Sequence, residues 1–299
     1  MTRAAIENWL ARLSDPRGLN AAWPAEAIAA DDARTVDRLL FEAERHSVQP
    51  VLFGHLLGLL RHDPDAFILG TGKQRGERAL ALIQSVNEKR LQETAQVMVL
   101  AEVAREVRSA MAGLPVALVK GLDFAEQIFG GIQYRSFADI DLLLHPSVEP
   151  DLRDILMRQG FNEHQPKADD VGYTERQWLK PHPQVGYILV ELHTDLVHTK
   201  RLRERISLDY ERYAGERSGG VTPAARLILA AVHAATSHLF GRLQYVVDGM
   251  MAARVGVDGK ELGQRAVETG AVLPLRTMLR LATEIFGAEE CRELLGSLP

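Results

Sequence analysis

The chain has 299 residues, 46% of them hydrophobic and 25% charged, which is the composition of an ordinary globular protein with a sizeable core. Its net charge of −5 argues against broad nucleic-acid binding, and its one cysteine, Cys291, excludes an intramolecular disulfide and a thiolate zinc cluster. No run approaches the roughly 18 apolar residues of a membrane span, and the N-terminus lacks the apolar run of a secretory signal, so we expect a cytoplasmic protein with no membrane contact.

Residues 1–113 are predicted to be helical. Apolar residues recur at three- and four-residue spacing in residues 33–47 and 49–62, as they do on one face of a helix. A longer periodic run begins at residue 77 and ends at Gly113, a residue type that commonly terminates helices. This run is long enough for a turn or kink to divide it.

A mixed α/β unit is predicted over residues 114–200. Residues 115–119 and 139–144 have strand character, as do residues 172–180 and 186–196. Helices are expected at residues 122–131 and 149–160, each closed by glycine.

The remainder, residues 201–299, is predicted to be helical. Thr222 followed by Pro223 predicts a helix start, and the apolar pattern continues to residue 240. His233 and His238 would then lie about 140° apart around one helix. That separation predicts packing or capping roles for them, not a shared metal. The fold class is therefore α+β, a small mixed sheet between an N-terminal and a C-terminal helical region.

Two aspartates stand two residues apart in the strand at 139–144. Side chains at i and i+2 project from the same face of a strand, so Asp139 and Asp141 share one face while Ile140, Leu142 and Leu144 pack on the other. Two like charges this close are costly when half-buried. A divalent cation between them removes the cost, and carboxylates are the ligands that Mg²⁺ prefers. The alternative is an exposed edge strand that carries two acids with no function.

Further polar residues accompany the pair. Lys120 and Gly121 lie between a predicted strand and helix, where glycine allows close backbone approach and lysine offers a charge for phosphate. Arg135 lies four residues before Asp139. Glu191 stands alone in an apolar strand and faces the same way as His193, which either orients a carboxylate or packs at the edge of the core.

These motifs together resemble the polymerase-β-like nucleotidyltransferase superfamily: a glycine-containing turn, then two aspartates on one strand, then a third acid on a later strand. "LVKG", "YRSFADIDLLL" and "VELH", followed by a helical C-terminal part, resemble a bacterial branch of uncharacterised nucleotidyltransferase-like proteins. The segments 45–57 and 238–252 also resemble this branch. Lys-Gly replaces the Gly-Ser of well-studied members, and the gap between Gly121 and Asp139 is longer than theirs.

The resemblance implies an enzyme that transfers a nucleotidyl group from a nucleoside triphosphate (NTP) to an acceptor and releases pyrophosphate. It implies that Asp139, Asp141 and Glu191 hold two Mg²⁺ ions (Mn²⁺ being an alternative), about 3.5–4 Å apart. Lys120, Gly121 and Arg135 would bind the triphosphate. A small molecule, a peptide, a protein or a tRNA would fit as the acceptor.

Two other functions are compatible with the residues. A degenerate nucleotidyltransferase would bind nucleotide as a regulatory module without turnover. A metal-dependent glycosyltransferase also uses an Asp-x-Asp motif, but it places a nucleotide-binding half before that motif, where this chain has about 113 helical residues.

Overall fold

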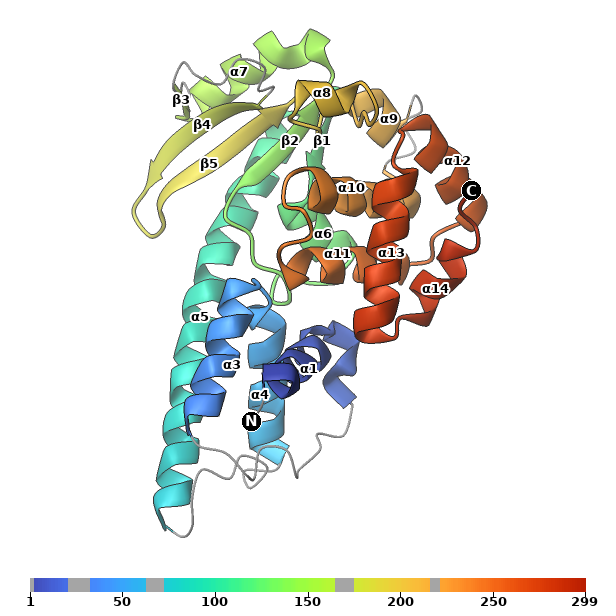
Figure 1. The fold of residues 1–299 in the computed structure, drawn as a ribbon. Helices are drawn as coiled ribbons and strands as arrows, with labels where there is room; N and C mark the ends of the chain where they lie inside the picture. The colour runs from blue at the N-terminus through green and yellow to red at the C-terminus, as the bar shows by residue number, and fades with distance from the viewer. Residues whose placement is uncertain (1–2, 21–32, 63–72, 165–174, 216–220) are drawn as a thin grey trace.

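The computed structural model describes residues 3–20, 33–62, 73–164, 175–215 and 221–299. It confirms the α+β prediction, because a five-stranded mixed sheet follows an N-terminal group of helices and precedes a C-terminal one (Figure 1). The N-terminal elements are α1 (Arg3–Ser14), the 3₁₀ helix η1 (Pro16–Asn20), α3 (Ala33–Arg45), α4 (Gln49–His62) and α5 (Lys73–Ala110).

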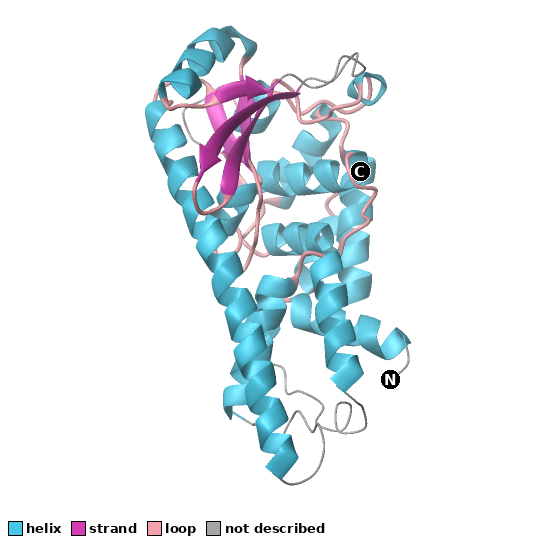
Figure 2. Ribbon diagram, turned by 90° about the vertical axis from the view of Figure 1, so that its left-hand side faces the viewer, coloured by secondary structure: helices cyan, strands magenta, loops and turns pink. Residues whose placement is uncertain are grey.

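Helix α5 is a single unbroken helix of 38 residues, so no turn or kink divides it. It runs from the N-terminal helices at one end of the molecule to the sheet at the other, and a view from the side shows the sheet lying against its second half (Figures 1 and 2). Charged residues are spread along α5. None of the described helices combines the length and the apolar character needed to cross a membrane.

The sheet has the strand order β1-β2-β5-β4-β3. Its central pair, β2 and β5, is parallel, and the other pairs are antiparallel. The strand at the β3 edge is only three residues long, and the sequence pattern did not predict it. The strands and the helices between them are β1 (Val116–Val119), α6 (Gly121–Gln127), β2 (Ile140–Leu144), η2 (Pro146–Val148), α7 (Glu149–Arg158), β3 (Asn162–His164), β4 (Glu175–His182) and β5 (Gly186–His193).

One face of the sheet is apolar and packed. Ile140, Leu142 and Leu144 of β2 are buried with Val190 and Leu192 of β5 against α5 and α7. The predicted alternation is thus confirmed for both strands. The other face carries the polar side chains of the same strands, because successive residues point to opposite faces.

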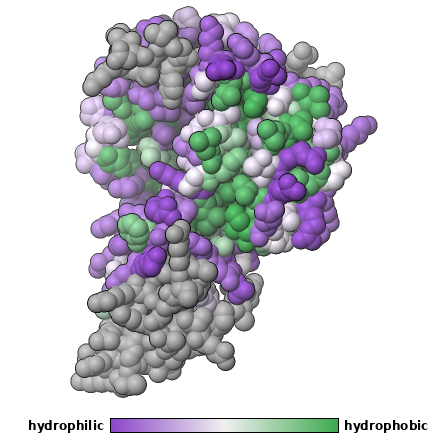
Figure 3. Space-filling view, in the orientation of Figure 1, coloured by the Kyte–Doolittle hydropathy of each residue, from purple (hydrophilic) through white to green (hydrophobic). Residues whose placement is uncertain are grey.

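The N-terminal and C-terminal helices share one hydrophobic core. This core contains residues from Trp9 to Leu57 and from Ala224 to Leu298, and α1 contacts both α11 and α13. The C-terminal elements are α8 (Lys200–Arg203), α9 (Tyr210–Ala214), α10 (Pro223–Thr236), α11 (Leu243–Ala253), α12 (Gly259–Glu268), α13 (Val272–Phe286) and α14 (Glu289–Leu295). Hydrophobic side chains also gather on the visible surface over α10, α11 and α13 (Figure 3).

Helix α10 begins as predicted but ends early. The Thr222 hydroxyl caps it by accepting a hydrogen bond from the amide of Ala225 at 3.2 Å. The predicted continuation to residue 240 is wrong, because the helix ends at Thr236 and the turn that follows has positive φ at Leu239 and Phe240. This turn brings His238 back toward His233.

The sequence pattern predicted that His233 and His238 would lie about 140° apart around one helix. In the structure the two rings are instead in contact. Their centroids lie 4.7 Å apart, edge to face. The ring of His238 also stacks on that of Tyr245, 4.3 Å away and nearly parallel. These three rings form one aromatic group that joins the end of α10 to α11.

Candidate active site

Acidic side chains from three neighbouring strands meet on the polar face of the sheet. The parallel register of β2 and β5 places Asp141 directly beside Glu191, although 50 residues separate them in sequence. Asp139 precedes β2 by one residue. On the far side of β5, antiparallel β4 places Gln177 beside Glu191 and Glu175 beside His193. Sheet pairing alone therefore assembles the cluster.

Asp141 is the most enclosed member of this cluster. Its Oδ1 accepts a hydrogen bond from Lys120 Nζ at 2.7 Å and lies 2.9 Å from His193 Nε2, and all three side chains are buried. Burial alone would raise the pKa of Asp141. The Lys120 ammonium and the hydrogen bond from His193 outweigh burial and hold that pKa well below its usual range. Asp141 is therefore ionised at neutral pH.

Glu191 behaves in the opposite way. Its Oε1 accepts a hydrogen bond from the Gln177 amide at 3.1 Å, and the same amide donates to Glu175 at 2.8 Å. Burial, followed by the charges of Asp141 and Glu175, raises the pKa of Glu191 to about 8. No arginine within the described residues pairs with Glu191 to offset this repulsion.

Asp139 lies between these extremes. Burial and the charge of Asp141 raise its pKa to about 6, even though the charges of Lys120 and Arg135 favour its ionised form. The cluster thus holds more carboxylates than its cations neutralise. That is the electrostatic condition under which a bound cation is stabilising.

The turn between β1 and α6 closes one side of the site. Lys120 has a positive φ of 52°, a conformation uncommon for residues other than glycine. Gly121 follows, and a β-carbon there would lie 3.4 Å from both the Asp139 carbonyl oxygen and the Phe137 ring. The close packing of this turn on the chain before β2 sets the position of the Lys120 ammonium.

Arg135 lies in the loop before β2, where it forms a two-point ion pair with Asp248 of α11. Its Nε and Nη2 donate to the two carboxylate oxygens at 2.8 and 3.0 Å, and Gln244 also donates to Asp248. A weaker contact, 3.3 Å, links Arg135 to the carbonyl of Gly121. The structure therefore joins Arg135 to Gly121 and to the C-terminal helices.

A cavity of about 1040 Å³ opens above the acidic cluster. Its walls come from the N-terminal helices, the sheet and the segment that joins α10 to α11. Residues from each of these parts line it, among them Gln49, Glu93, Lys120, Gly121, Arg135, Asp139, Asp141, Glu175, Glu191, His198, His238 and Tyr245. Its volume is at the upper end of that typical for small-molecule sites.

Residues 32–287 match the model of a family described as uncharacterised nucleotidyltransferase. The chain belongs to this nucleotidyltransferase family. No curated protein and no solved structure was found to match it. The match covers α3, α4 and α5, the sheet and the C-terminal helices up to α13, and it therefore includes all three parts that line the cavity.

The site of this nucleotidyltransferase fits a divalent cation. Asp141 and Glu191 each offer a ligand oxygen, and these oxygens lie within 4.8 Å of each other and of a ring nitrogen of His193. The carbonyl oxygen of Asp139 packs against Gly121, and the charge of the Asp139 carboxylate also raises the pKa of Glu191. The buried, mutually repelling carboxylates provide the oxygen ligands that Mg²⁺ and Mn²⁺ prefer.

Three polar residues of the site were not singled out from the sequence. Glu175 and Gln177 alternate in β4 in the same way as Asp139 and Asp141 around β2, so strand alternation is the signal that could have found them. His198 lies beyond the end of β5 and has no periodic signal. Burial lowers the pKa of His198 to about 4, which leaves its imidazole neutral at physiological pH.

Proposed function

We propose that this nucleotidyltransferase is Mg²⁺-dependent and moves a nucleoside monophosphate group from an NTP to an acceptor, with release of pyrophosphate. The observation that carries the proposal is the placement of Asp139, Asp141 and Glu191 on one polar sheet face beneath a large cavity, with too few cations to neutralise them. A cluster of carboxylates that is short of positive charge favours the binding of a divalent cation, to which the phosphates of an NTP can then coordinate.

Asp139, Asp141 and Glu191 are the residues that would hold the ion. A bound Mg²⁺ supplies charge stabilisation for the attacking and leaving oxygens of the reaction. The acceptor oxygen forms a bond to the α-phosphorus while the bond to the oxygen that bridges the α- and β-phosphorus breaks, and pyrophosphate leaves. Glu191, which lines the cavity beside Asp141, takes the acceptor proton as general base.

Lys120 lines the cavity, and its ammonium is in direct contact with Asp141 of the acidic cluster. In the absence of a ligand it pairs with Asp141. When a metal occupies the carboxylates, Lys120 can turn its ammonium toward the triphosphate, with Gly121 allowing the close approach. Arg135 keeps its pair with Asp248 in this scheme and contributes its charge at longer range.

The test is a transfer assay with ATP, CTP, GTP or UTP labelled at the α-phosphate, Mg²⁺ and a cell extract as the source of acceptor. We expect label to appear in an acceptor fraction and pyrophosphate to form in equal amount. Asp141→Asn should abolish both. Asp154→Asn, which removes an exposed acid of α7, is the matched control and should retain full activity.

Glu191→Gln separates the chemistry from the binding. It keeps the shape of the side chain, and Asp139 and Asp141 still hold the metal that accompanies the NTP, so NTP–Mg²⁺ binding measured by calorimetry should be largely retained. Turnover should fall by at least about 10², the lower end for loss of an acid–base group. Nucleotide binding without any transfer in the wild type would show a binding module, and transfer from a UDP-sugar would show a glycosyltransferase.

A further inference from the structure

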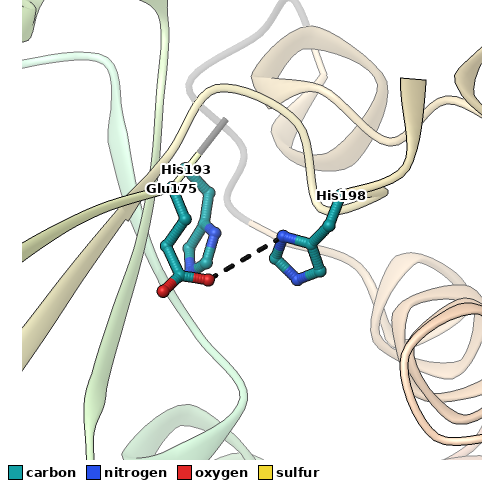
Figure 4. Close-up of side chains that lie close together, drawn as sticks. All are labelled: Glu175, His193 and His198. Carbon is teal, nitrogen blue, oxygen red and sulfur yellow. Dashed lines mark ion pairs between the residues drawn. The ribbon is translucent and has the colours of Figure 1, made fainter. Parts of the chain in front are cut away.

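A second group of potential ligands lies beside the acidic cluster. Glu175, His193 and His198 each offer one ligand atom, and the three atoms lie within 4.8 Å of one another. Figure 4 shows the two imidazoles and the carboxylate converging from β4, from β5 and from the segment that follows β5. His198 Nδ1 lies 3.9 Å from Glu175 Oε2, and the two rings are 5.3 Å apart.

The hydrogen bonding of His193 leaves a ring nitrogen for a ligand. Its Nε2 lies 2.9 Å from Asp141 Oδ1, and because a carboxylate oxygen accepts hydrogen bonds, Nε2 is the donor in this contact and Nδ1 can offer a lone pair to a ligand. The His193 side chain is completely buried, and Nδ1 has no hydrogen-bond partner in the part of the chain that the structure describes. A buried acceptor of this kind needs an explanation.

We propose that Glu175, His193 and His198 bind a transition-metal ion of the Zn²⁺ class at a site separate from the carboxylates that bind Mg²⁺. Two imidazoles and one carboxylate favour zinc over magnesium, which prefers oxygen ligands alone. Asp141 would hold His193 from behind, the arrangement in which a carboxylate fixes the tautomer of a metal-bound histidine.

The geometry needs only a small adjustment. Ligand atoms around a tetrahedral zinc ion are about 3.4 Å apart, given bond lengths near 2.0–2.1 Å. His198 lies outside the regular strands, so a modest movement of its ring brings the three ligands together. Glu175 and His198 line the cavity, so the fourth position of the ion would face the cavity and take a water molecule or an oxygen of the acceptor.

The experiment is a Zn²⁺ titration of metal-free protein by calorimetry, with Mg²⁺ in excess to keep the oxygen-rich site occupied. We expect one Zn²⁺ per chain. His198→Ala and Glu175→Gln each remove a direct ligand of the metal. Each should weaken Zn²⁺ binding by more than the roughly 10–100-fold expected when the residue lost only hydrogen-bonds to a ligand. His238→Ala, which removes a cavity histidine outside the group, should change Zn²⁺ affinity less than about twofold.

Asp139→Asn distinguishes the two sites. If Zn²⁺ occupies the Mg²⁺ site, this variant will lose Zn²⁺ as severely as His198→Ala does, and the proposal is wrong. The proposal is also wrong if the wild type takes up no Zn²⁺ in the presence of Mg²⁺. Because neither result involves turnover, the test is independent of whether the protein transfers nucleotides.

Co²⁺ gives a readout that needs no variant. Four-coordinate Co²⁺ bound through two imidazoles and a carboxylate absorbs visible light strongly, whereas six-coordinate Co²⁺ among carboxylates and water absorbs weakly. A strong visible spectrum that Zn²⁺ abolishes and Mg²⁺ does not would support the site. A weak spectrum that Mg²⁺ abolishes would overturn it.

Discussion

Lys120 combines an unusual backbone conformation with a buried charge. Its φ of 52° is one that glycine adopts freely and other residues adopt at a cost of about 1–2 kcal/mol. Its ammonium is buried against Asp141 at 2.7 Å. A glycine in this position would relieve the backbone but would leave Asp141 without its cation, so the ion pair accounts for the presence of lysine.

Replacing Lys120 by alanine should lower the free energy of unfolding by about 3–5 kcal/mol, the usual cost of removing one partner from a buried ion pair. Lys120→Gly loses the same pair but relaxes the positive φ, so it should be about 1 kcal/mol more stable than Lys120→Ala. Urea denaturation measures both values. NTP affinity should fall more than Mg²⁺ affinity in both variants, and unchanged NTP affinity would restrict Lys120 to a structural role.

The carboxyl groups of Glu191 and Asp139 should make the proposed metal binding dependent on pH. Their pKa values of about 8 and about 6 in the metal-free protein mean that protons must leave before a cation binds. Mg²⁺ affinity should therefore rise about 10–100-fold between pH 6 and pH 8. Calorimetry in two buffers of different ionisation enthalpy would also detect the released protons. An affinity independent of pH over this range would contradict the prediction.

The carboxyl groups of Glu191 and Asp139 also make the stability of the metal-free protein dependent on pH. This stability should fall as pH rises, whereas Mg²⁺ affinity should rise. A carboxyl whose pKa is raised by folding binds its proton more tightly in the folded chain than in the unfolded one. Its favourable contribution is present at low pH and is lost as pH rises through the folded pKa. Metal-free protein should thus lose stability between about pH 5 and pH 8, and Mg²⁺ should restore it.

Strand alternation was sufficient to predict which side chains share a face, but not which strands are neighbours. Asp141 and Glu191 each stand in a clear apolar alternation, so their orientation was readable in the sequence. Their direct pairing depends on the parallel register of β2 and β5, which no local pattern specifies. His198 and the partner of Arg135 were missed for the same reason, because both depend on tertiary packing.

The end of α10 shows the limit of helix patterns. Residues 237–240 continue the apolar spacing, and residues 224–238 contain no glycine or proline that would signal an end. The chain nevertheless leaves the helix through positive φ at Leu239 and Phe240, and this places His238 on Tyr245. The packing of the aromatic rings at the cavity wall therefore coincides with a local backbone strain.

Leu239→Asn tests that strain. The leucine side chain is 84% exposed, so little packing is lost, and asparagine tolerates positive φ better than leucine does. The variant should gain up to about 1 kcal/mol of stability, or about 2–4 °C in Tm. Leu273→Asn is the matched control, a leucine 75% exposed within α13, and should show no gain. Equal effects in both variants would mean that the turn stores no strain.

The whole molecule is held together at the site by a few long-range pairs. Arg135 and Asp248 are 113 residues apart, nearly fully buried, and join the loop before β2 to α11. Arg226 of α10 and Asp123 of α6 form a second such pair. These contacts fix the C-terminal helices over the sheet, so the cavity between them has a defined width.

Asp248→Asn should lower the free energy of unfolding by about 3–5 kcal/mol, because it leaves the buried Arg135 guanidinium without its counter-charge. The double replacement Arg135→Met with Asp248→Leu should recover much of that loss, since apolar side chains of similar size need no pairing. Glu284→Gln, in an exposed pair with Arg280, is the control and should cost less than about 1 kcal/mol. Comparable losses in Asp248→Asn and Glu284→Gln would show that the buried pair is not needed.

The core shared by the first and last helices has a consequence for how the chain is made. Helix α1 buries its apolar side chains against α11 and α13, and the residues of α4 belong to the same core. About 160 residues lie between α4 and α10, so at 5–20 residues per second a ribosome needs roughly 10–30 s to supply the missing partners. During that interval the N-terminal helices expose hydrophobic surface. We therefore expect nascent chains to interact with chaperones until α10 and α11 have emerged.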